Sequence, residues 1–140
     1  MCYWRQCCCC HNVAIGGHVQ IDDNAIIGGN SAIHQFIRIG KFAMIGGICA
    51  VIRDVIPYGL VHGNRSVLQG INLIGLRRKN IPNQEIALLS KAYKEIFKSK
   101  NLSENLKNLS EEFKENHLVK EILKFIQMDK KRPICTPFLK

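Results

Sequence analysis

Aliphatic residues recur every six positions between residues 13 and 56. The first register holds Ile15, Ile21, Ile27, Ile33, Ile39, Ile45 and Val51, and a second register two positions earlier holds Val13, Val19, Ala25, Ser31, Ile37, Ala43, Cys49 and Val55. Glycine follows the first register at Gly16, Gly28, Gly40 and Gly46. A half-buried strand repeats every two residues and a helix about every 3.6, so a period of six indicates a parallel β-helix built from hexapeptides.

Such a repeat predicts where each side chain points. Three hexapeptides make one triangular coil of about 18 residues, so residues one coil apart stack on one wall. We expect the isoleucines of the first register, from Ile15 to Ile45, to fill the interior, and the glycines to provide positive φ angles at the corners. His18, Gln35 and Lys41 are expected to point outward. A sandwich of ordinary short strands is the alternative, but sandwich strands do not repeat every six residues.

The pattern changes after the repeat. Pro57, Gly59, Gly63 and Gly70 interrupt residues 57–76 at irregular spacing, which indicates loops and one or two short strands. These elements are expected to cap the coil, because an open end exposes apolar side chains and unpaired backbone groups.

From Asn80 onward the apolar residues follow a helical period. A first helix starts near Pro82, and its apolar stripe is Ile86, Leu89, Tyr93, Ile96 and Phe97. A second helix from Ser103 uses Leu102, Leu106, Leu109 and Phe113, and a third uses Leu118, Val119, Ile122, Leu123 and Ile126. The tail, residues 129–140, is expected to be loose. We therefore divide the chain into a cysteine-rich leader (1–11), hexapeptide coils with capping loops (12–76) and a helical domain (77–140).

The leader, MCYWRQCCCC, carries five of the seven cysteines. Four adjacent cysteines do not easily turn their sulfurs onto one tetrahedral ion, so we expect no metal site, and the odd cysteine count supports no disulfide framework. The leader also lacks the apolar core of a secretory signal, while palmitoylation remains an alternative. We interpret it as a foreign or misread start on a chain whose own beginning is missing. The cysteine usage indicates a reducing, cytoplasmic location.

Composition limits the partners. The 140 residues are 46% hydrophobic, and no apolar run has the length of a membrane span. The formal charge of +9 favours an acidic partner, such as nucleic acid, an anionic membrane surface, a phosphorylated ligand or an acidic carrier protein. Nucleic acid is disfavoured, because the chain has one Trp and three Tyr and no recognisable nucleic-acid motif.

Two motifs are more specific than the hexapeptides, namely HQF at 34–36 and GLRRK at 75–79. With the run GGHVQIDDN at 16–24, DVIPYGLVHGN at 54–64 and SKAYKEIF at 90–97, they closely resemble the C-terminal half of the acyl-carrier-protein:UDP-N-acetylglucosamine O-acyltransferase family. The resemblance covers roughly residues 12–127. It implies an all-β left-handed parallel β-helix followed by an α-helical C-terminal domain, in a homotrimer with active sites between subunits.

The same resemblance implies the reaction. The family moves a 3-hydroxyacyl chain from the phosphopantetheine thioester of acyl carrier protein to the 3-hydroxyl of UDP-N-acetylglucosamine, the first step of lipid A synthesis, with no further cofactor. A neutral His removes the hydroxyl proton and a backbone N–H stabilises the oxyanion. By motif, Gly17 supplies that N–H, His18 contacts the sugar, and His34 and Gln35 line the same wall. Gln35 also follows Gly17 by one full coil, so the repeat itself stacks the two.

The remaining matches concern the nucleotide and the acyl chain. Asn72 and Arg78 match residues that hold the UDP portion, with Lys79 completing a basic pair, and a guanidinium suits a diphosphate. Gly47 matches the position that limits acyl-chain depth. Each match has a plainer reading: Gly17 and Gly47 as corner glycines, His18 as an exposed polar residue, and 77–79 as a basic turn beside a helix.

Some positions depart from the family. Ile74 stands where some relatives have an acidic nucleotide contact, and Arg65, in a loop linked to acyl selectivity, leaves the chain length open. The resemblance puts the general-base His one coil below Gly17, before Met1, and His11 is expected to face another wall. We therefore expect an acyltransferase fragment that is inactive alone. The alternative is a non-catalytic module that binds acyl carrier protein or assembles with other subunits.

Overall fold

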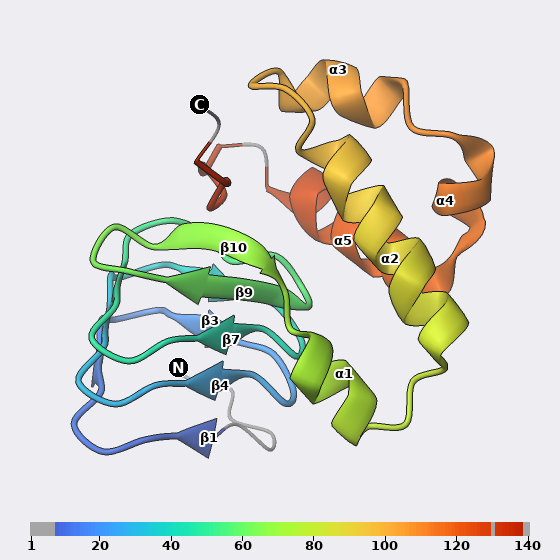
Figure 1. Cartoon of the computed structure of the whole chain (residues 1–140). Coiled ribbons are helices and arrows are strands. Elements are labelled where there is room, and N and C mark those ends of the chain that lie inside the picture. The colour runs from blue at the N-terminus through green and yellow to red at the C-terminus, as the bar shows by residue number, and fades with distance from the viewer. Residues whose placement is uncertain (1–7, 130, 139–140) are drawn as a thin grey trace.

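A computed structural model describes residues 8–129 and 131–138. Figure 1 shows a stacked coil of short strands, with one helix beside it and a group of helices above and to one side. The coil strands are β1 (Cys8–Cys9), β2 (Ala14–Ile15), β3 (Gln20–Ile21), β4 (Ile26–Ile27), β5 (Ala32–Ile33), β6 (Arg38–Ile39), β7 (Met44–Ile45) and β8 (Ala50–Val51).

The strands form three faces of a triangular coil. Face 1 holds β1, β4 and β7, face 2 holds β2, β5 and β8, and face 3 holds β3 and β6. Every pair is parallel, and paired residues stand one full coil apart in the sequence, as in the column Ala14, Ala32 and Ala50. The parallel β-helix predicted from the hexapeptides is confirmed. Because Cys8 pairs with Ile26, the coil extends into the expected leader, of which residues 1–7 lie outside the described residues.

The interior is apolar as predicted. Ile21, Ile27, Ile33, Ile39 and Ile45 are at most 4% exposed. Ile15 is only partly buried, because it stands in the lowest described coil.

The outward positions also agree with the prediction. His18 and Gln35 are exposed. Lys41 points out of the coil but is half covered, and its ammonium lies 3.4 Å from the carboxylate of Glu121.

The expected role of the hexapeptide glycines is wrong. The left-handed corner conformation belongs to the residues Asn12, His18, Asn24, Asn30, Phe36, Phe42 and Ile48, with φ between 55° and 65°. The glycines of the repeat stand elsewhere, where consecutive coils approach closely. A Cβ on Gly16 would lie 2.5 Å from the backbone nitrogen of Gln35, and Gly28 and Gly40 face backbone in the same way. Glycine is therefore needed for contact between coils rather than for φ.

The second register ends before Val55. Val55 pairs with Ile39. A full coil after Ile39 would end two residues later than Val55, so Val55 occupies a position of the first register. The corner between β8 and residue 54 is therefore two positions shorter than the others. Val55 is still fully buried, which is why hydrophobicity alone did not reveal the shift.

A hairpin caps face 1, in agreement with the expected short strands. β9 (Gly59–His62) pairs parallel with β7, and β10 (Val67–Ile71) pairs antiparallel with β9. The backbone hydrogen-bonding edge of β7 is thereby covered.

The helices are α1 (Leu73–Arg78), α2 (Asn83–Ile96), α3 (Leu102–Lys107), α4 (Glu111–Glu115) and α5 (His117–Met128). The expected domain boundary at 76/77 falls inside α1. The single helix expected from Ser103 is wrong: it is divided into α3 and α4, and Leu109 in the break is 4% exposed. The break allows Leu109 to turn into the core.

The described part of the tail pairs with the coil, although the tail was expected to be loose. Ile134 forms a parallel bridge with Asp54, and the amide of Cys135 donates to the Asp54 carbonyl at 2.8 Å. Ile134 is 7% exposed and Cys135 fully buried. Apolar burial and backbone pairing of a short segment fix it, despite its two prolines and basic residues.

A buried ion pair of the coil lies in contact with α5. Arg38 Nε lies 2.7 Å from Asp54 Oδ2, and the Asp54 side chain is fully buried. The Arg38 guanidinium also donates to the carbonyl of Phe125 at 3.3 Å and lies 4.3 Å from its ring centroid. Tyr58 donates to Glu121 nearby. The helical part is thus attached to face 3 by polar as well as apolar contacts.

Candidate functional site

The corners of the coil form three edges, which we name by the faces they separate. The first edge, between faces 1 and 2, carries Gly29 and Gly47; the second, between faces 2 and 3, carries Gly17 and Gln35. The third, between faces 3 and 1, carries Lys41 and Phe42. The residues predicted from the sequence are distributed over all three edges.

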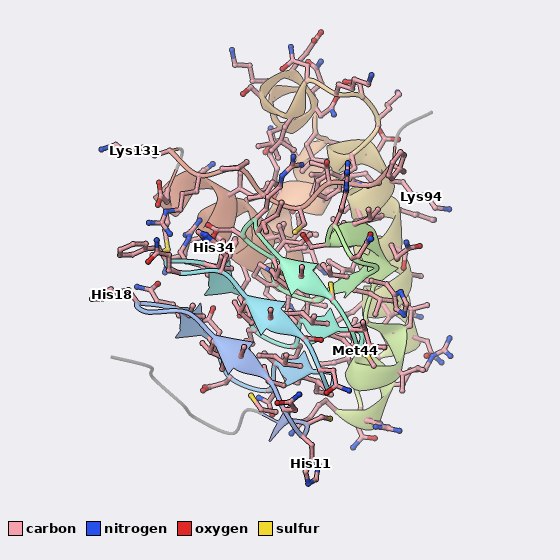
Figure 2. All side chains as sticks on the ribbon, turned by 90° about the vertical axis from the view of Figure 1, so that its left-hand side faces the viewer. His11, His18, His34, Met44, Lys94 and Lys131 are labelled. Atoms are coloured by element: carbon pink, nitrogen blue, oxygen red, sulfur yellow. The ribbon has the colours of Figure 1, made fainter. Side chains whose placement is uncertain are left out.

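The second edge brings four predicted residues together. The amide of Phe36 donates to the carbonyl of Gly17 at 2.9 Å, so Gly17 and Gln35 occupy the same corner of consecutive coils, as predicted. The His18 ring stacks on Phe36 with 5.0 Å between centroids and 4° between planes. Figure 2 shows His18 and His34 on the same side, one above the other, with His11 apart at the bottom.

The amide of Gly17 is free to act as a hydrogen-bond donor. It makes no hydrogen bond to any described residue, and Gly17 is exposed. Its φ lies outside the left-handed region, and a Cβ would meet nothing within 4 Å. At the matching corner positions, a Cβ on Gly29 or Gly47 would lie 3.2 Å or 3.3 Å from a carbonyl oxygen of the coil below, so the plainer reading of Gly17 as a corner glycine remains the alternative.

Face 2 adds an apolar groove beside this edge. The outward side chains Ala14, Ala32 and Ala50 leave about 550 Å³ of space that is bounded by His34 and Gln35. His34 Nδ1 lies 3.3 Å from the carbonyl of Gln35, so the tautomer that donates there leaves Nε2 as an acceptor.

Gly47 stands on the first edge, across face 2 from Gln35. It is exposed, and a Cβ on it would lie 3.3 Å from the carbonyl oxygen of Gly29. Gly47 therefore stands at the border of face 2 opposite Gln35.

Asn72, predicted to touch nucleotide, has its side chain engaged within the fold. It is 3% exposed, its Oδ1 accepts from the Gly75 amide at 3.0 Å, and its Nδ2 donates to the Phe42 carbonyl at 2.9 Å. A Cβ on Gly75 would collide with this side chain. Asn72 therefore caps α1 and holds it against the third edge.

Arg78 and Lys79 lie at the exposed end of α1. Lys79 Nζ is 6.0 Å and Lys41 Nζ 5.7 Å from the ring centroid of Phe42, which stacks on Tyr58 at 5.9 Å. Arg78 has no ion-pair partner among the described residues. The third edge is thus a basic corner built around an aromatic ring.

Sequence reasoning missed the aromatic part of this corner. Tyr58 stands two positions short of a full coil after Phe42, because the preceding corner is shortened. The period of the repeat therefore does not predict that the two rings stack. Burial first, and then the hydrogen bond and negative charge of Glu121, raise the pKa of Tyr58 well above its usual range, which keeps the phenol protonated. Its hydroxyl is therefore a donor and not a base at neutral pH.

One chain does not bring the three edges into a single site. They lie at different corners of the triangle, with the packed interior between them. Within the described residues, no three His, Cys, Asp or Glu side chains are grouped to hold a metal ion. No helix in this part of the chain has the length and apolarity needed to cross a membrane.

The comparisons place this hexapeptide β-helix among known proteins. The family model described as UDP N-acetylglucosamine O-acyltransferase, domain 2, matches residues 54–135. The acyl-[acyl-carrier-protein]–UDP-N-acetylglucosamine O-acyltransferase of Sinorhizobium fredii is 41% identical over 128 residues, covering 91% of this chain and 47% of that protein. The protein of that name from Nautilia profundicola is 40% identical, covering 91% and 49%.

Solved structures of proteins with the same family name are also similar to this chain. The UDP-N-acetylglucosamine acyltransferase of Arabidopsis has a TM-score of 0.87 at 36% identity, covering 92% of this chain and 48% of that one. That of Francisella novicida has a TM-score of 0.86 at 30% identity, covering 95% and 49%. The fold class is the hexapeptide β-helix with a helical addition. The chain belongs to the UDP-N-acetylglucosamine O-acyltransferase family, and it spans about half the length of the curated relatives it matches.

Proposed function

We propose that this chain forms part of an acyltransferase that moves a 3-hydroxyacyl group from acyl carrier protein to the 3-hydroxyl of UDP-N-acetylglucosamine. The observation that carries the proposal is the second edge. There Gly17, whose amide makes no hydrogen bond to a described residue, stands one coil below Gln35 and beside the apolar groove of face 2.

Each part of the site has a role in this proposal. The Gly17 N–H stabilises the oxyanion that forms when the sugar hydroxyl attacks the thioester carbonyl. His18, His34 and Gln35 orient the sugar, and the alanines of face 2 accept the acyl chain as far as Gly47. The general base is expected from one coil below Gly17. We therefore propose that residues 1–140 alone turn over no substrate.

The nucleotide is proposed to bind at the third edge. Arg78 and Lys79 are exposed cations that suit a diphosphate. Asn72 and Gly75 fix the helix that presents them.

Three copies of the chain, each folded as a left-handed coil, would complete the site by packing side by side. The edges lie at different corners of one triangle, so the second edge of one copy meets the third edge only when a neighbour supplies it. We propose a homotrimer that works in the cytoplasm. The net charge of +9 favours the acidic carrier protein as partner.

A chimaera tests the proposal. The N-terminal half of the Sinorhizobium fredii relative is placed before Val13, and transfer from hydroxyacyl carrier protein to UDP-N-acetylglucosamine is measured. We expect turnover by the chimaera, none by residues 1–140, and at least about a tenfold loss in kcat/KM for Gln35→Ala. A folded trimeric chimaera without turnover, or with turnover that Gln35→Ala leaves unchanged, would overturn the proposal.

A second candidate is a module that binds the carrier protein without catalysis, favoured by the positive charge. It predicts that residues 1–140 bind acyl carrier protein in calorimetry while the chimaera remains inactive. Activity of the chimaera decides between the two.

A further inference from the structure

Three side chains lie in contact along the second edge, and the third of them belongs to the C-terminal tail. The His18 ring stacks on the ring of Phe36, one coil later, with 5.0 Å between centroids. The guanidinium carbon of Arg132 lies 5.2 Å from the centroid of the same Phe36 ring. Figure 2 shows Lys131, the neighbour of Arg132, on the same side of the molecule as His18. The tail thus reaches the predicted sugar contact through one aromatic ring.

Phe36 is an unfavourable residue for the fold alone. Its φ is 65°, a left-handed conformation that asparagine adopts more readily than phenylalanine, and asparagine stands at the corners Asn12, Asn24 and Asn30. The Phe36 side chain is also 42% exposed, so the ring contributes little to the interior of the coil. Its contacts with His18 and a guanidinium give this ring a role outside the core.

The tail takes the place above Phe36 on this edge. Asp54 follows Phe36 by one full coil, but its side chain is fully buried and lies 2.7 Å from Arg38, so it does not continue the stack. The amide of Asp54 donates instead to the carbonyl of Pro133 at 3.1 Å, directly after Arg132 in the chain. The backbone beside Arg132 is therefore fixed on the coil.

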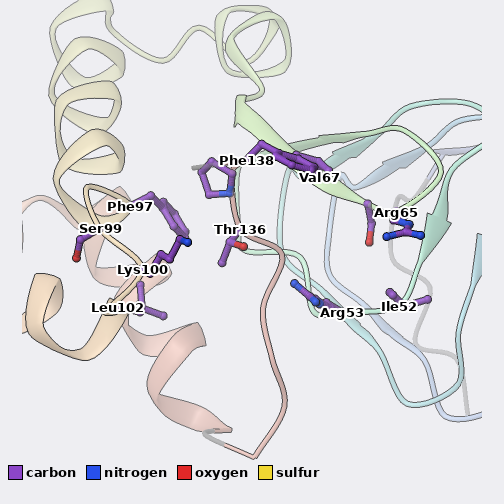
Figure 3. A pocket seen from close by; sticks show the side chains of 12 residues that line it. Ile52, Arg53, Arg65, Val67, Phe97, Ser99, Lys100, Leu102, Thr136 and Phe138 are labelled. Carbon is purple, nitrogen blue, oxygen red and sulfur yellow. The ribbon is translucent and has the colours of Figure 1, made fainter. Parts of the chain in front are cut away.

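The next tail residues extend this attachment. Figure 3 shows Thr136 with Ile52 and Arg53 of the coil on one side and Phe97, at the end of α2, on the other. The amide of Leu68 in β10 donates to the carbonyl of Thr136 at 3.2 Å. The position of Arg132 thus depends on the coil and the capping hairpin as well as on α5, which precedes it.

Asp129, at the end of α5, lies beside the guanidinium. Arg132 Nε is 3.9 Å from Asp129 Oδ2, and the two side chains are 36% and 33% exposed. An ion pair this long and exposed contributes little stability. A guanidinium near the face of a phenyl ring is attracted by the ring quadrupole, and at exposed sites this attraction is at least as strong. The contact therefore restrains both Arg132 and Phe36.

We propose that Arg132 is a positioning residue for His18. Its guanidinium holds the ring of Phe36, and this ring holds the imidazole in the orientation that contacts the sugar. Arg132 itself touches no substrate. The consequence for sugar binding rests on the proposed function, whereas the stack of three side chains does not.

NMR of the 140-residue chain with labelled histidine tests the stack without catalysis. The ring current of Phe36 should move the His18 ring protons upfield, and Phe36→Asn should abolish this shift. We expect Arg132→Gln to move the signals toward their positions in Phe36→Asn, and Arg132→Lys to move them less, because a cation is retained. Lys131→Gln removes an exposed neighbouring cation and should leave them unchanged. Circular dichroism verifies that each variant is folded.

Kinetics of the chimaera test the effect on the sugar. Arg132→Gln should raise the KM for UDP-N-acetylglucosamine by about two- to fivefold, the range of an exposed cation–π contact, and leave kcat unchanged. The KM for hydroxyacyl carrier protein should not change, although a general loss of structure would alter it. Arg132→Lys should give an intermediate value, and Lys131→Gln the value of the parent. In a His18→Ala background, Arg132→Gln should have no further effect.

Several results would overturn the proposal. These are His18 signals that Arg132→Gln leaves in place, an effect of Lys131→Gln as large as that of Arg132→Gln, or an undiminished effect of Arg132→Gln in the His18→Ala background. His18 signals that do not respond to Arg132→Gln in an active chimaera reject the positioning role alone. A folded trimeric chimaera without turnover rejects the proposed function, and with it the consequence for the sugar.

Discussion

Glycines of the coil differ in what a side chain would meet, and the difference follows their position in the hexapeptide. A Cβ on Gly28 would collide with the backbone of Gly47 in the next coil, whereas a Cβ on Gly17 would meet nothing within 4 Å. The sequence predicts that both lie near corners, but only the structure shows that one is required for packing.

Substitution by alanine should separate these two glycines. We expect Gly28→Ala to lower the free energy of unfolding by about 1 to 3 kcal/mol, because backbone must move to admit the methyl group. Gly17→Ala should leave it unchanged or raise it by up to about 1 kcal/mol, because alanine restricts the unfolded chain. Urea unfolding followed by circular dichroism measures both. Equal destabilisation by the two changes would contradict the packing argument.

Asp22 gives a pH-dependent prediction. Desolvation by burial, with added repulsion from Asp23 and opposed by Arg38, raises the pKa of Asp22 above 3.8. Because the folded pKa exceeds the unfolded one, the stabilising contribution of Asp22 is present below the unfolded pKa. It is lost as the pH rises through the folded pKa.

Replacing the carboxyl by an amide should remove this dependence. The Asp22 side chain is partly desolvated by its neighbours but remains solvent-accessible, so screening keeps the effect small. We expect Asp22→Asn to raise the free energy of unfolding by at most about 0.5 kcal/mol at neutral pH. No gain is expected well below pH 3.8. Thermal unfolding across pH, with Glu112→Gln as an exposed control, measures the difference. The same gain at both pH values would rule out ionisation as its cause.

Among the elements, the hydrophobic period of six residues was enough to predict the coil, and the period of 3.6 residues was enough to predict α2 and α5. Boundaries were less predictable where a contact distant in sequence decides them. The start of α1 depends on Asn72, whose Nδ2 reaches the Phe42 carbonyl 30 residues earlier. The described part of the tail pairs with Asp54, which lies in the coil more than half the chain before it, and neither pairing has a local sequence signal.

Asn72 should therefore behave as a positioning residue for α1. Asn72→Ala removes the helix cap and the bond to Phe42, and we expect a loss of about 1 to 3 kcal/mol in the free energy of unfolding. Faster hydrogen exchange at Leu76 to Asn80 should accompany it. Asn72→Ser retains a capping oxygen and should lose less. In the chimaera, weaker UDP binding by Asn72→Ala and partial rescue by Asn72→Ser would support positioning. Unchanged exchange in α1 would contradict it.

For the whole molecule, the Arg38–Asp54 pair links the coil, the tail and α5. Removing Asp54 leaves the Arg38 guanidinium, 12% exposed, without its counter-ion. We expect Asp54→Ala to lower the free energy of unfolding by about 3 to 5 kcal/mol. Glu111→Ala, which breaks an exposed pair with Lys114, should change it by less than about 1 kcal/mol. Equal effects would show that the buried pair does not hold the parts together.

The central claim is that the second and third edges act together only across neighbouring copies. The most direct measurement mixes two chimaeras, one with Gln35→Ala and one with Arg78→Ala, unfolded and refolded together. Each variant alone should be nearly inactive. Random mixed trimers should restore activity at about one site in four, because some interfaces pair an intact second edge with an intact third edge. Activity no greater than the sum of the separate variants would place both edges in a site within one chain and contradict the account.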